Sequence, residues 1–180
     1  MSLDQLINDC KKKDTKAQEQ LYRLFSSKLF SICLKYSRSY AEAEDNLQDG
    51  FIIAFEKIQQ FNFKGSFEGW IKRIMINNIL QQYRGVSFME PINDNISDGT
   101  EIELDDENIS MDYLMKIIQE LPDRYRLVFN LYVLDDYAHK EIAAMLDITT
   151  GTSKSNLARA RMILKQKVEQ YTAINKLSAK

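Results

Sequence analysis

Apolar residues recur at steps of three and four along most of this 180-residue chain, a spacing that places side chains on one face of an α-helix. Long stripes run from Ala17 to Tyr36, from Ala43 to Ile58 and from Phe67 to Tyr83, and a short helix is expected near Leu3–Lys12. We find no apolar–polar alternation long enough for a β-strand, and 6 Gly and 2 Pro are few for a turn-rich β fold. The sequence therefore predicts an all-α protein.

The second half of the chain carries further helical patterns. The expected helices are Met111–Leu121, Arg124–Leu134, a short one around Lys140–Leu146, and a long one over Gly151–Tyr171. Residues 85–110, by contrast, have no helical period and include Pro91. We therefore expect two small helical domains, residues 1–84 and 111–180, joined by a linker over residues 85–110.

Charge is distributed unevenly over these parts. The chain has 24 Lys and Arg against 26 Asp and Glu, and a net charge of −2 argues against nucleic-acid binding because phosphate contacts need a basic surface. Residues 85–112, however, contain nine acidic residues and no Lys or Arg, whereas residues 1–84 carry a net +3 and residues 113–180 a net +4. An acidic linker thus separates two mildly basic domains, and its charge is expected to discourage the free protein from binding DNA.

Residues 139–164 have the pattern of a DNA-reading helix-turn-helix. Ile142, Ala143 and Leu146 are expected to face inward. Asp147 is expected to occupy a turn at positive φ, and Thr149 to cap the second helix. Five basic residues and no acid follow between residues 148 and 168, which favours contact with phosphates. The alternative is an ordinary helical hairpin with a solvated basic face. The expected DNA contacts are Thr152, Lys154, Ser155, Asn156, Arg159 and Arg161.

Further motifs make the interpretation more specific. They are Glu42–Phe51, Phe67–Asn77 followed by Arg84, and Leu121–Arg126. With the helix-turn-helix, and in this order and spacing, they resemble the sigma-70 family of RNA polymerase sigma factors, most closely the short two-domain extracytoplasmic-function (ECF) group. The resemblance implies a bacterial transcription initiation factor that binds core RNA polymerase and directs it to promoters by melting the −10 element and reading the −35 element in the major groove.

The resemblance assigns polymerase docking to the Glu42–Phe51 motif. Asp45, Gln48 and Asp49 are spaced to lie on neighbouring turns of one helix, where they would form a polar, acidic strip. In the family this helix binds the coiled coil of the polymerase β′ subunit, so the same role is expected here for this strip together with Phe51. Without the resemblance, a solvated helix face would be the simpler interpretation.

The second motif combines an aromatic ring with hydrogen-bond donors. Arg73 and Asn77 follow Trp70 at three and seven residues, on adjoining parts of one helix face, and stacking plus donors is the chemistry that holds an unpaired base. For the Trp70 ring itself, packing in the core is an open alternative. The resemblance implies that this helix and the loop before it, residues 61–66, open the −10 element. The expected −10 contacts are Lys64, Ser66, Trp70, Arg73, Asn77 and Arg84.

The expected partners follow from the resemblance: core RNA polymerase, through its β′ coiled coil and β flap, promoter DNA, and an anti-sigma factor. No catalytic residue, metal or cofactor is expected, because the only histidine, His139, has no Ser or Cys partner suggested nearby and the chain has two cysteines at distant positions. No apolar run approaches a membrane span, so we expect a cytoplasmic protein without membrane insertion. A dimeric operator-binding regulator and a protein-interaction adaptor are the alternative functions.

Overall fold

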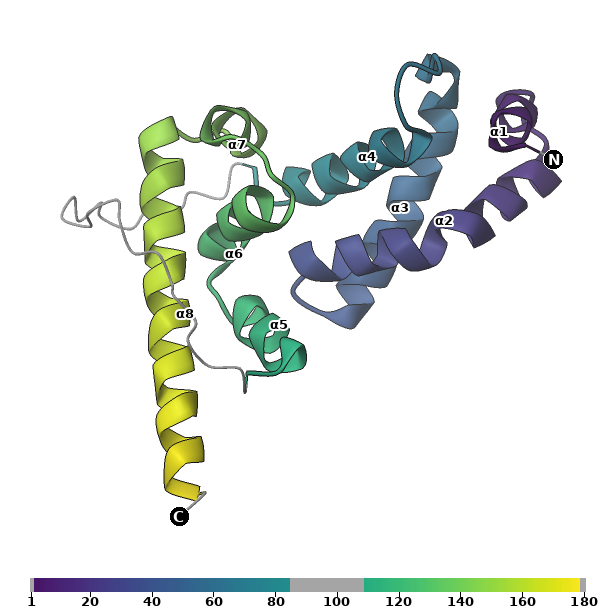
Figure 1. Cartoon of the computed structure of the whole chain (residues 1–180). Coiled ribbons are helices and arrows are strands. Elements are labelled where there is room, and N and C mark those ends of the chain that lie inside the picture. Colours follow the sequence, from purple (N-terminus) through teal and green to yellow (C-terminus); the bar gives the residue numbers. More distant parts are fainter. Residues whose placement is uncertain (1, 85–108, 179–180) are drawn as a thin grey trace. The chain divides into compact units, whose positions relative to one another are not determined.

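A computed structural model describes residues 2–84 and 109–178 of the chain, and every regular element in these ranges is helical (Figure 1). The prediction of an all-α protein is therefore confirmed. The chain divides into two compact units, with the boundary in the sequence between Arg84 and Gly85, and we describe each unit by itself. Most of the predicted acidic linker lies outside the described residues. Among the described helices, none is both long and apolar enough to cross a membrane.

The first unit is built from three long helices that pack against one another, preceded by a short one (Figure 1). The elements are α1 (Leu3–Lys11), α2 (Thr15–Tyr36), α3 (Tyr40–Lys57), the 3₁₀ turn η1 (Ile58–Gln60) and α4 (Phe67–Gln81). Each α-helix begins at a polar residue whose side chain accepts a hydrogen bond from a backbone N–H of the first turn. These capping residues are Ser2, Asp14, Ser39 and Ser66. The predicted apolar stripes supply the core between the helices.

In the second unit, one long helix supports three shorter ones. The elements are α5 (Met111–Gln119), α6 (Asp123–Phe129), the π-helical turn η2 (Asn130–Leu134), α7 (His139–Leu146) and α8 (Thr150–Ser178), and α8 packs against α5, α6 and α7. The turn at Pro122 is held by Arg126, which is 3% exposed. Its guanidinium donates to the carbonyl of Leu121 at 3.1 Å and pairs with Asp123 at 2.6 Å. A buried charge is tolerated here because it has both an ionic partner and a carbonyl acceptor.

Two predicted helices differ in their extent. The single helix expected over Arg124–Leu134 is regular only as far as Phe129 and continues as the π-helical turn η2. The last helix was expected to end near Tyr171 but continues to Ser178. Within its predicted range, α8 is held against α5, because the Tyr113 ring stacks on Tyr171 with centroids 4.0 Å apart and the Tyr113 hydroxyl donates to the carbonyl of Lys167 at 3.1 Å.

Candidate nucleic-acid and protein interfaces

The predicted docking strip lies on the outer face of α3, where Asp45, Gln48 and Asp49 are all exposed. Phe51 does not belong to this surface: it is 3% exposed, and its ring lies 4.6 Å from the ring of Tyr22 on α2. The prediction that Phe51 contacts a partner is therefore wrong for the protein as folded. Its side chain belongs to the apolar stripe that fixes α3 on the core.

An apolar residue that α3 does present beside the acids is Ile52, which is 57% exposed. Ile52 follows Asp45 by seven residues and Asp49 by three, so the three side chains share one face of the helix. Residue type alone does not distinguish Ile52 from Phe51, because the two are neighbours in the chain and both are apolar. The helical phase could have separated them, since Phe51 is in step with Leu47 and Ala54, whereas Ile52 is in step with the acids.

Asn46, on the inner side of α3, fixes the orientation of this face. It is 1% exposed, its amide donates to the Ser37 hydroxyl at 2.9 Å, and its carbonyl oxygen accepts from Gln82 at 2.7 Å. These two hydrogen bonds join α3 to the end of α2 and to the end of α4. Buried amides need such partners, so the network favours one arrangement of the three helices.

The loop before α4 carries two of the predicted −10 contacts, Lys64 and Ser66, and both are exposed. Ser66 is also the N-cap of α4, and its hydroxyl accepts from the backbone N–H of Gly69 at 3.0 Å. Phe63, in the same loop, is not among the predicted contacts. Its ring is 39% exposed and its φ is +61°, a left-handed conformation that is uncommon for a bulky residue.

Trp70, in the first part of α4, is partly exposed rather than fully buried. One side of the ring packs in an aromatic cluster, with centroids 5.5 Å from Phe61 and 5.4 Å from Phe67. Arg73 and Asn77 are exposed one and two turns further along α4. Lys64 and Ser66 thus directly precede the helix whose first three turns carry the partly exposed Trp70 ring and the donors Arg73 and Asn77.

Arg84, the sixth predicted −10 contact, is exposed but lies beyond the other end of α4. An α-helix rises about 1.5 Å per residue, so the 15 residues of α4 span about 22 Å and place Arg84, beyond the far end, more than about 20 Å from the loop that precedes the helix. The structure does not bring it together with Lys64 and Ser66.

The helix-turn-helix has the predicted local geometry. Asp147 adopts φ 56° and ψ 49°, in the left-handed region, and Ile142, Ala143 and Leu146 are buried. The Thr149 hydroxyl accepts from the backbone N–H of Thr152 at 3.0 Å, as expected for the N-cap of α8. The Thr152 hydroxyl lies 2.8 Å from the Thr149 hydroxyl. Thr152, a predicted DNA contact, therefore already has a hydrogen-bond partner within the protein.

The predicted DNA contacts on α8 are exposed to different degrees. Lys154 is exposed, and Thr152, Ser155, Arg159 and Arg161 are half-buried. Asn156 is 8% exposed, so its side chain packs inside the unit and the prediction that it reaches a base edge is wrong for the protein as folded.

Arg159 has a partner within the protein, because its guanidinium donates to the hydroxyl of Tyr125 at 3.2 Å. The same hydroxyl accepts from Arg124 at 2.9 Å, and the Arg124 guanidinium lies 4.7 Å from the Tyr125 ring centroid. Tyr125 thus joins two cations on α6 and α8. Its position orients Arg159, which the sequence analysis treated as a free donor.

The only histidine of the chain has a serine partner that the sequence did not suggest. His139 Nδ1 lies 2.9 Å from the hydroxyl of Ser153, and its ring stacks on Tyr132 at 4.4 Å. Ser153 is 0% exposed, so its hydroxyl is not accessible to a substrate as a nucleophile. The His139–Ser153 hydrogen bond instead joins α7 to α8, the two helices of the helix-turn-helix.

Neither cysteine offers a reactive centre. Burial raises the pKa of the Cys33 thiol to about 12, and burial together with the nearby carboxylates of Asp14 and Asp9 raises the pKa of Cys10 to about 11. Within residues 2–84 and 109–178, no group of three or more His, Cys, Asp or Glu side chains could hold a metal ion.

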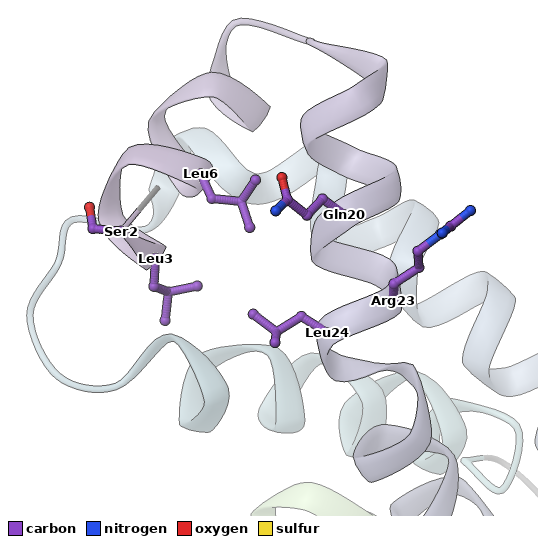
Figure 2. Close-up of a pocket in the computed structure, with 6 residues that line it drawn as sticks. All are labelled: Ser2, Leu3, Leu6, Gln20, Arg23 and Leu24. Atoms are coloured by element: carbon purple, nitrogen blue, oxygen red, sulfur yellow. The ribbon is translucent and has the colours of Figure 1, made fainter.

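A hollow of about 440 Å³ lies between α1 and α2, away from the predicted site residues. Figure 2 shows Leu3 and Leu6 of α1 facing Leu24 of α2 across it. The remaining lining residues are Ser2, Gln20 and Arg23.

Comparison with known families identifies both units. The profile of sigma-70 region 2 matches residues 21–87, and that of sigma-70 region 4 matches residues 111–164. The chain is 27% identical to the ECF RNA polymerase sigma factor SigW of Bacillus subtilis, over 93% of this chain and 97% of SigW. It is 26% identical to the ECF RNA polymerase sigma-E factor of Escherichia coli K12, over 91% of this chain and 93% of that protein.

Two solved structures share the fold. One is the sigma factor RpoE of Bartonella quintana in complex with the anti-sigma factor NepR, with a TM-score of 0.50 at 23% identity over 84% of this chain and 96% of RpoE. The other is CnrH in complex with the cytosolic domain of CnrY, with a TM-score of 0.50 at 18% identity over 92% of this chain and 96% of CnrH. From the matches to both regions and the relatives that span most of its length, the chain belongs to the sigma-70 family and is an ECF sigma factor for transcription initiation.

Proposed function

We propose that the chain divides the work of initiation between its two domains, residues 1–84 and 111–180. The sigma-70 family is non-enzymatic, so the chemistry belongs to the polymerase. The first domain docks on core RNA polymerase and opens the −10 element, and the second reads the −35 element. The acidic segment over residues 85–110 joins them. The protein would act in the cytoplasm, where bacterial transcription takes place.

The α3 face supports the docking proposal. It presents Asp45, Gln48, Asp49 and the apolar Ile52 to solvent, while its opposite side is held by the core and by the Asn46 network. An exposed isoleucine among carboxylates suits a partner surface that offers both apolar and basic side chains. The β′ coiled coil is the proposed partner.

The start of α4 supports the melting proposal. Lys64 offers a positive charge for the phosphate backbone, Trp70 and Phe63 offer partly exposed rings, and Arg73 and Asn77 offer donors for base edges. Single-stranded DNA is bound by this combination of charge, stacking and donors.

The helix-turn-helix supports the −35 proposal through the geometry of its turn. The left-handed Asp147 and the Thr149 cap set the start of α8, with Lys154 exposed on its second turn. We propose that Lys154, Arg159 and Arg161 contact DNA there, with Thr152 and Ser155 near the backbone. The β flap of the polymerase would hold this domain in place.

An anti-sigma factor is the proposed regulator. RpoE of Bartonella quintana and CnrH were each solved with a partner protein, which is named as an anti-sigma factor for RpoE. A comparable partner for this chain would compete with polymerase for the exposed faces of the two domains.

Reconstituted transcription tests the function. The protein is added to core RNA polymerase with genomic DNA, and the 5′ ends of the transcripts are mapped. We expect initiation at a set of sites that share −10 and −35 sequences. Initiation no different from that of core polymerase alone would overturn the proposal, and duplex binding as a dimer without polymerase would favour an operator-binding regulator.

Substitutions on α3 test the docking face. We expect Asp49→Asn and Ile52→Ala each to weaken binding to core polymerase by about 1–2 kcal/mol, the cost for the minority of interface residues that lie at the centre of a contact. Glu19→Gln is the matched control, because Glu19 is an exposed acid on α2 that pairs only with Arg23 of the same helix in the described structure. The readout is fluorescence anisotropy of labelled protein titrated with core enzyme. Equal losses for all three variants would contradict a specific α3 interface.

A further inference from the structure

The loop that precedes α4 is held by a residue fifty positions earlier in the chain. Lys11 is the last residue of α1, and its ammonium group donates to the carbonyl oxygen of Phe61 at 2.6 Å. The same ammonium group lies 4.6 Å from the centroid of the Phe63 ring. In return, the Gln59 side chain donates to the carbonyl oxygen of Lys11 at 2.5 Å. Two hydrogen bonds therefore join the end of α1 to the start of the loop, one donated from each side.

The backbone of the loop needs such support. Phe63 adopts φ +61°, and strained conformations of bulky residues persist only where their surroundings hold them. Phe61, which Lys11 also binds, is 4% exposed and packs against Phe63, Phe67 and Trp70 with ring centroids 5.2–5.5 Å apart. Phe63 is the member of this cluster that remains 39% exposed. Lys11 thus contacts both the buried anchor of the loop and its exposed ring.

We propose that Lys11 is a positioning residue for −10 recognition. It holds Phe61–Lys64 in the conformation in which the Phe63 ring can stack on an unpaired base of the promoter. The inference rests on the proposed role of this loop in −10 melting. In this proposal Lys11 acts through the loop, since its ammonium group contacts the Phe61 carbonyl and the Phe63 ring.

This role is separable from folding. Helix α1 is fixed on the unit by Leu6, Ile7 and Cys10, all buried, whereas the Lys11 side chain is only half-buried. A methionine at position 11 keeps an unbranched side chain but has neither the charge nor the donor. We therefore expect Lys11→Met to leave the core of the unit in place and to release the loop.

The matched control is Lys12→Met. Lys12 is exposed and its ammonium group pairs with Asp9 at 2.9 Å, so this variant loses the same charge without touching the loop. It corrects for the general effect of one positive charge on DNA affinity. Lys11→Arg tests rescue, since a guanidinium retains both the donor and the cation–π contact.

Two measurements on the full-length protein report the effect. Trp70 is the only tryptophan of the chain and touches Phe61, so acrylamide quenching of its fluorescence reports the packing of the loop. The second is the affinity of the reconstituted holoenzyme for a labelled single strand, the non-template −10 region of a promoter found by the transcription mapping. Core polymerase affinity of each variant is measured alongside.

We expect Lys11→Met to increase quenching of Trp70 and to weaken strand binding by roughly three- to tenfold, because only part of the free energy lost with the charged hydrogen bond and the cation–π contact is passed on to strand binding. Lys12→Met should match the parent, Lys11→Arg should recover most of the binding, and core affinity should not change. Unchanged strand binding by Lys11→Met overturns the inference, as does an equal loss of core affinity. If Phe63→Leu still weakens strand binding in the first case, the −10 role of the loop stands. If it does not, that role fails as well.

Discussion

Lys154 and Asn156 are two residues apart near the start of α8, yet they have different surroundings. Lys154 is exposed, whereas Asn156 is 8% exposed. Both are polar residues of a type that reads base edges in the major groove, so residue type alone does not separate a DNA contact from a buried polar side chain. The burial of each side chain does separate the two cases. It predicts that substitution of Asn156 lowers stability and that substitution of Lys154 lowers DNA binding.

Asn156→Ala is expected to lower the free energy of unfolding by about 1–2 kcal/mol, because it removes a packed polar side chain, and to leave −35 base preference unchanged. Lys154→Ala should leave stability within about 0.5 kcal/mol and weaken promoter binding. If Lys154 contacts phosphate, the slope of log affinity against log salt should also fall by about one. Thermal unfolding and holoenzyme binding to promoters with each −35 base replaced are the measurements. Altered base preference in Asn156→Ala would contradict its buried role.

The buried thiols predict a loss of stability at alkaline pH. Burial raises the pKa of Cys33 from 9.0 to about 12, so above pH 9 the unfolded chain releases a proton that the folded chain keeps. The thiol's contribution is therefore complete below pH 9 and declines as the pH rises toward 12. Each such thiol lowers the free energy of unfolding by up to about 1.4 kcal/mol per pH unit in that window.

Guanidinium unfolding between pH 8 and 11 measures this effect. Other groups titrate in the same range, so the informative quantity is the difference between the parent and Cys33→Ala, which lacks the thiol. We expect a shallower decline in the variant. Identical slopes would show that Cys33 ionises equally in the folded and unfolded chain.

At the scale of the elements, apolar periodicity was enough to predict every long helix, because each one buries a single stripe. It was not enough where a neighbour decides the outcome. The apolar pattern gives no signal for the π-helical turn after Phe129, which packs against α7, or for the extension of α8 past Tyr171. The turn of the helix-turn-helix was predictable, since Asp147 and Thr149 act through their own backbone.

For the candidate sites, as for the helices, local pattern predicted which residues are exposed, but contacts between distant elements could not be predicted. Residue type and spacing identified the exposed acids of α3 and the donors of α4, which lie on the surface because they are polar. The errors were Phe51, whose neighbour Ile52 is the exposed residue, and Asn156. Lys11 could not have been found from sequence, because its contact with the loop spans fifty residues.

The crossing of α3 and α4 depends on a glycine. A Cβ at Gly50 would overlap the Sδ of Met75, which is 0% exposed and has little room to move. We expect Gly50→Ala to lower the free energy of unfolding by about 1–2 kcal/mol through overpacking, although alanine favours a helix by about 1 kcal/mol. In a Met75→Ala background the same change should become stabilising. Chemical unfolding of the four proteins closes the double-mutant cycle. An equal effect in both backgrounds would show that Met75 does not limit position 50.

At the scale of the whole molecule, the distribution of charge matters more than its sum. The net −2 conceals a basic first domain and a basic second domain, each carrying a DNA-facing surface in the proposed function. Residues 85–108 contribute eight acids and no Lys or Arg. Since phosphate contacts dominate non-specific affinity, these acids should lower the affinity of the free protein for any duplex.

Converting the eight acids to their amides tests this argument, because it changes the net charge from −2 to +6 without altering either helical domain. We expect the amide variant to bind promoter duplex more tightly in the absence of polymerase, and its affinity to fall more steeply between about 50 and 200 mM salt. Fluorescence anisotropy with labelled duplex measures both quantities.

A variant with the residues of 85–108 in shuffled order keeps the charge and should bind as weakly as the parent. If the shuffled variant gains as much affinity as the amide variant, the order of the residues restrains DNA binding and their charge does not. If neither variant gains affinity, the two domains of the free protein do not bind duplex DNA by themselves. Their basic residues would then contact DNA only when polymerase holds the promoter.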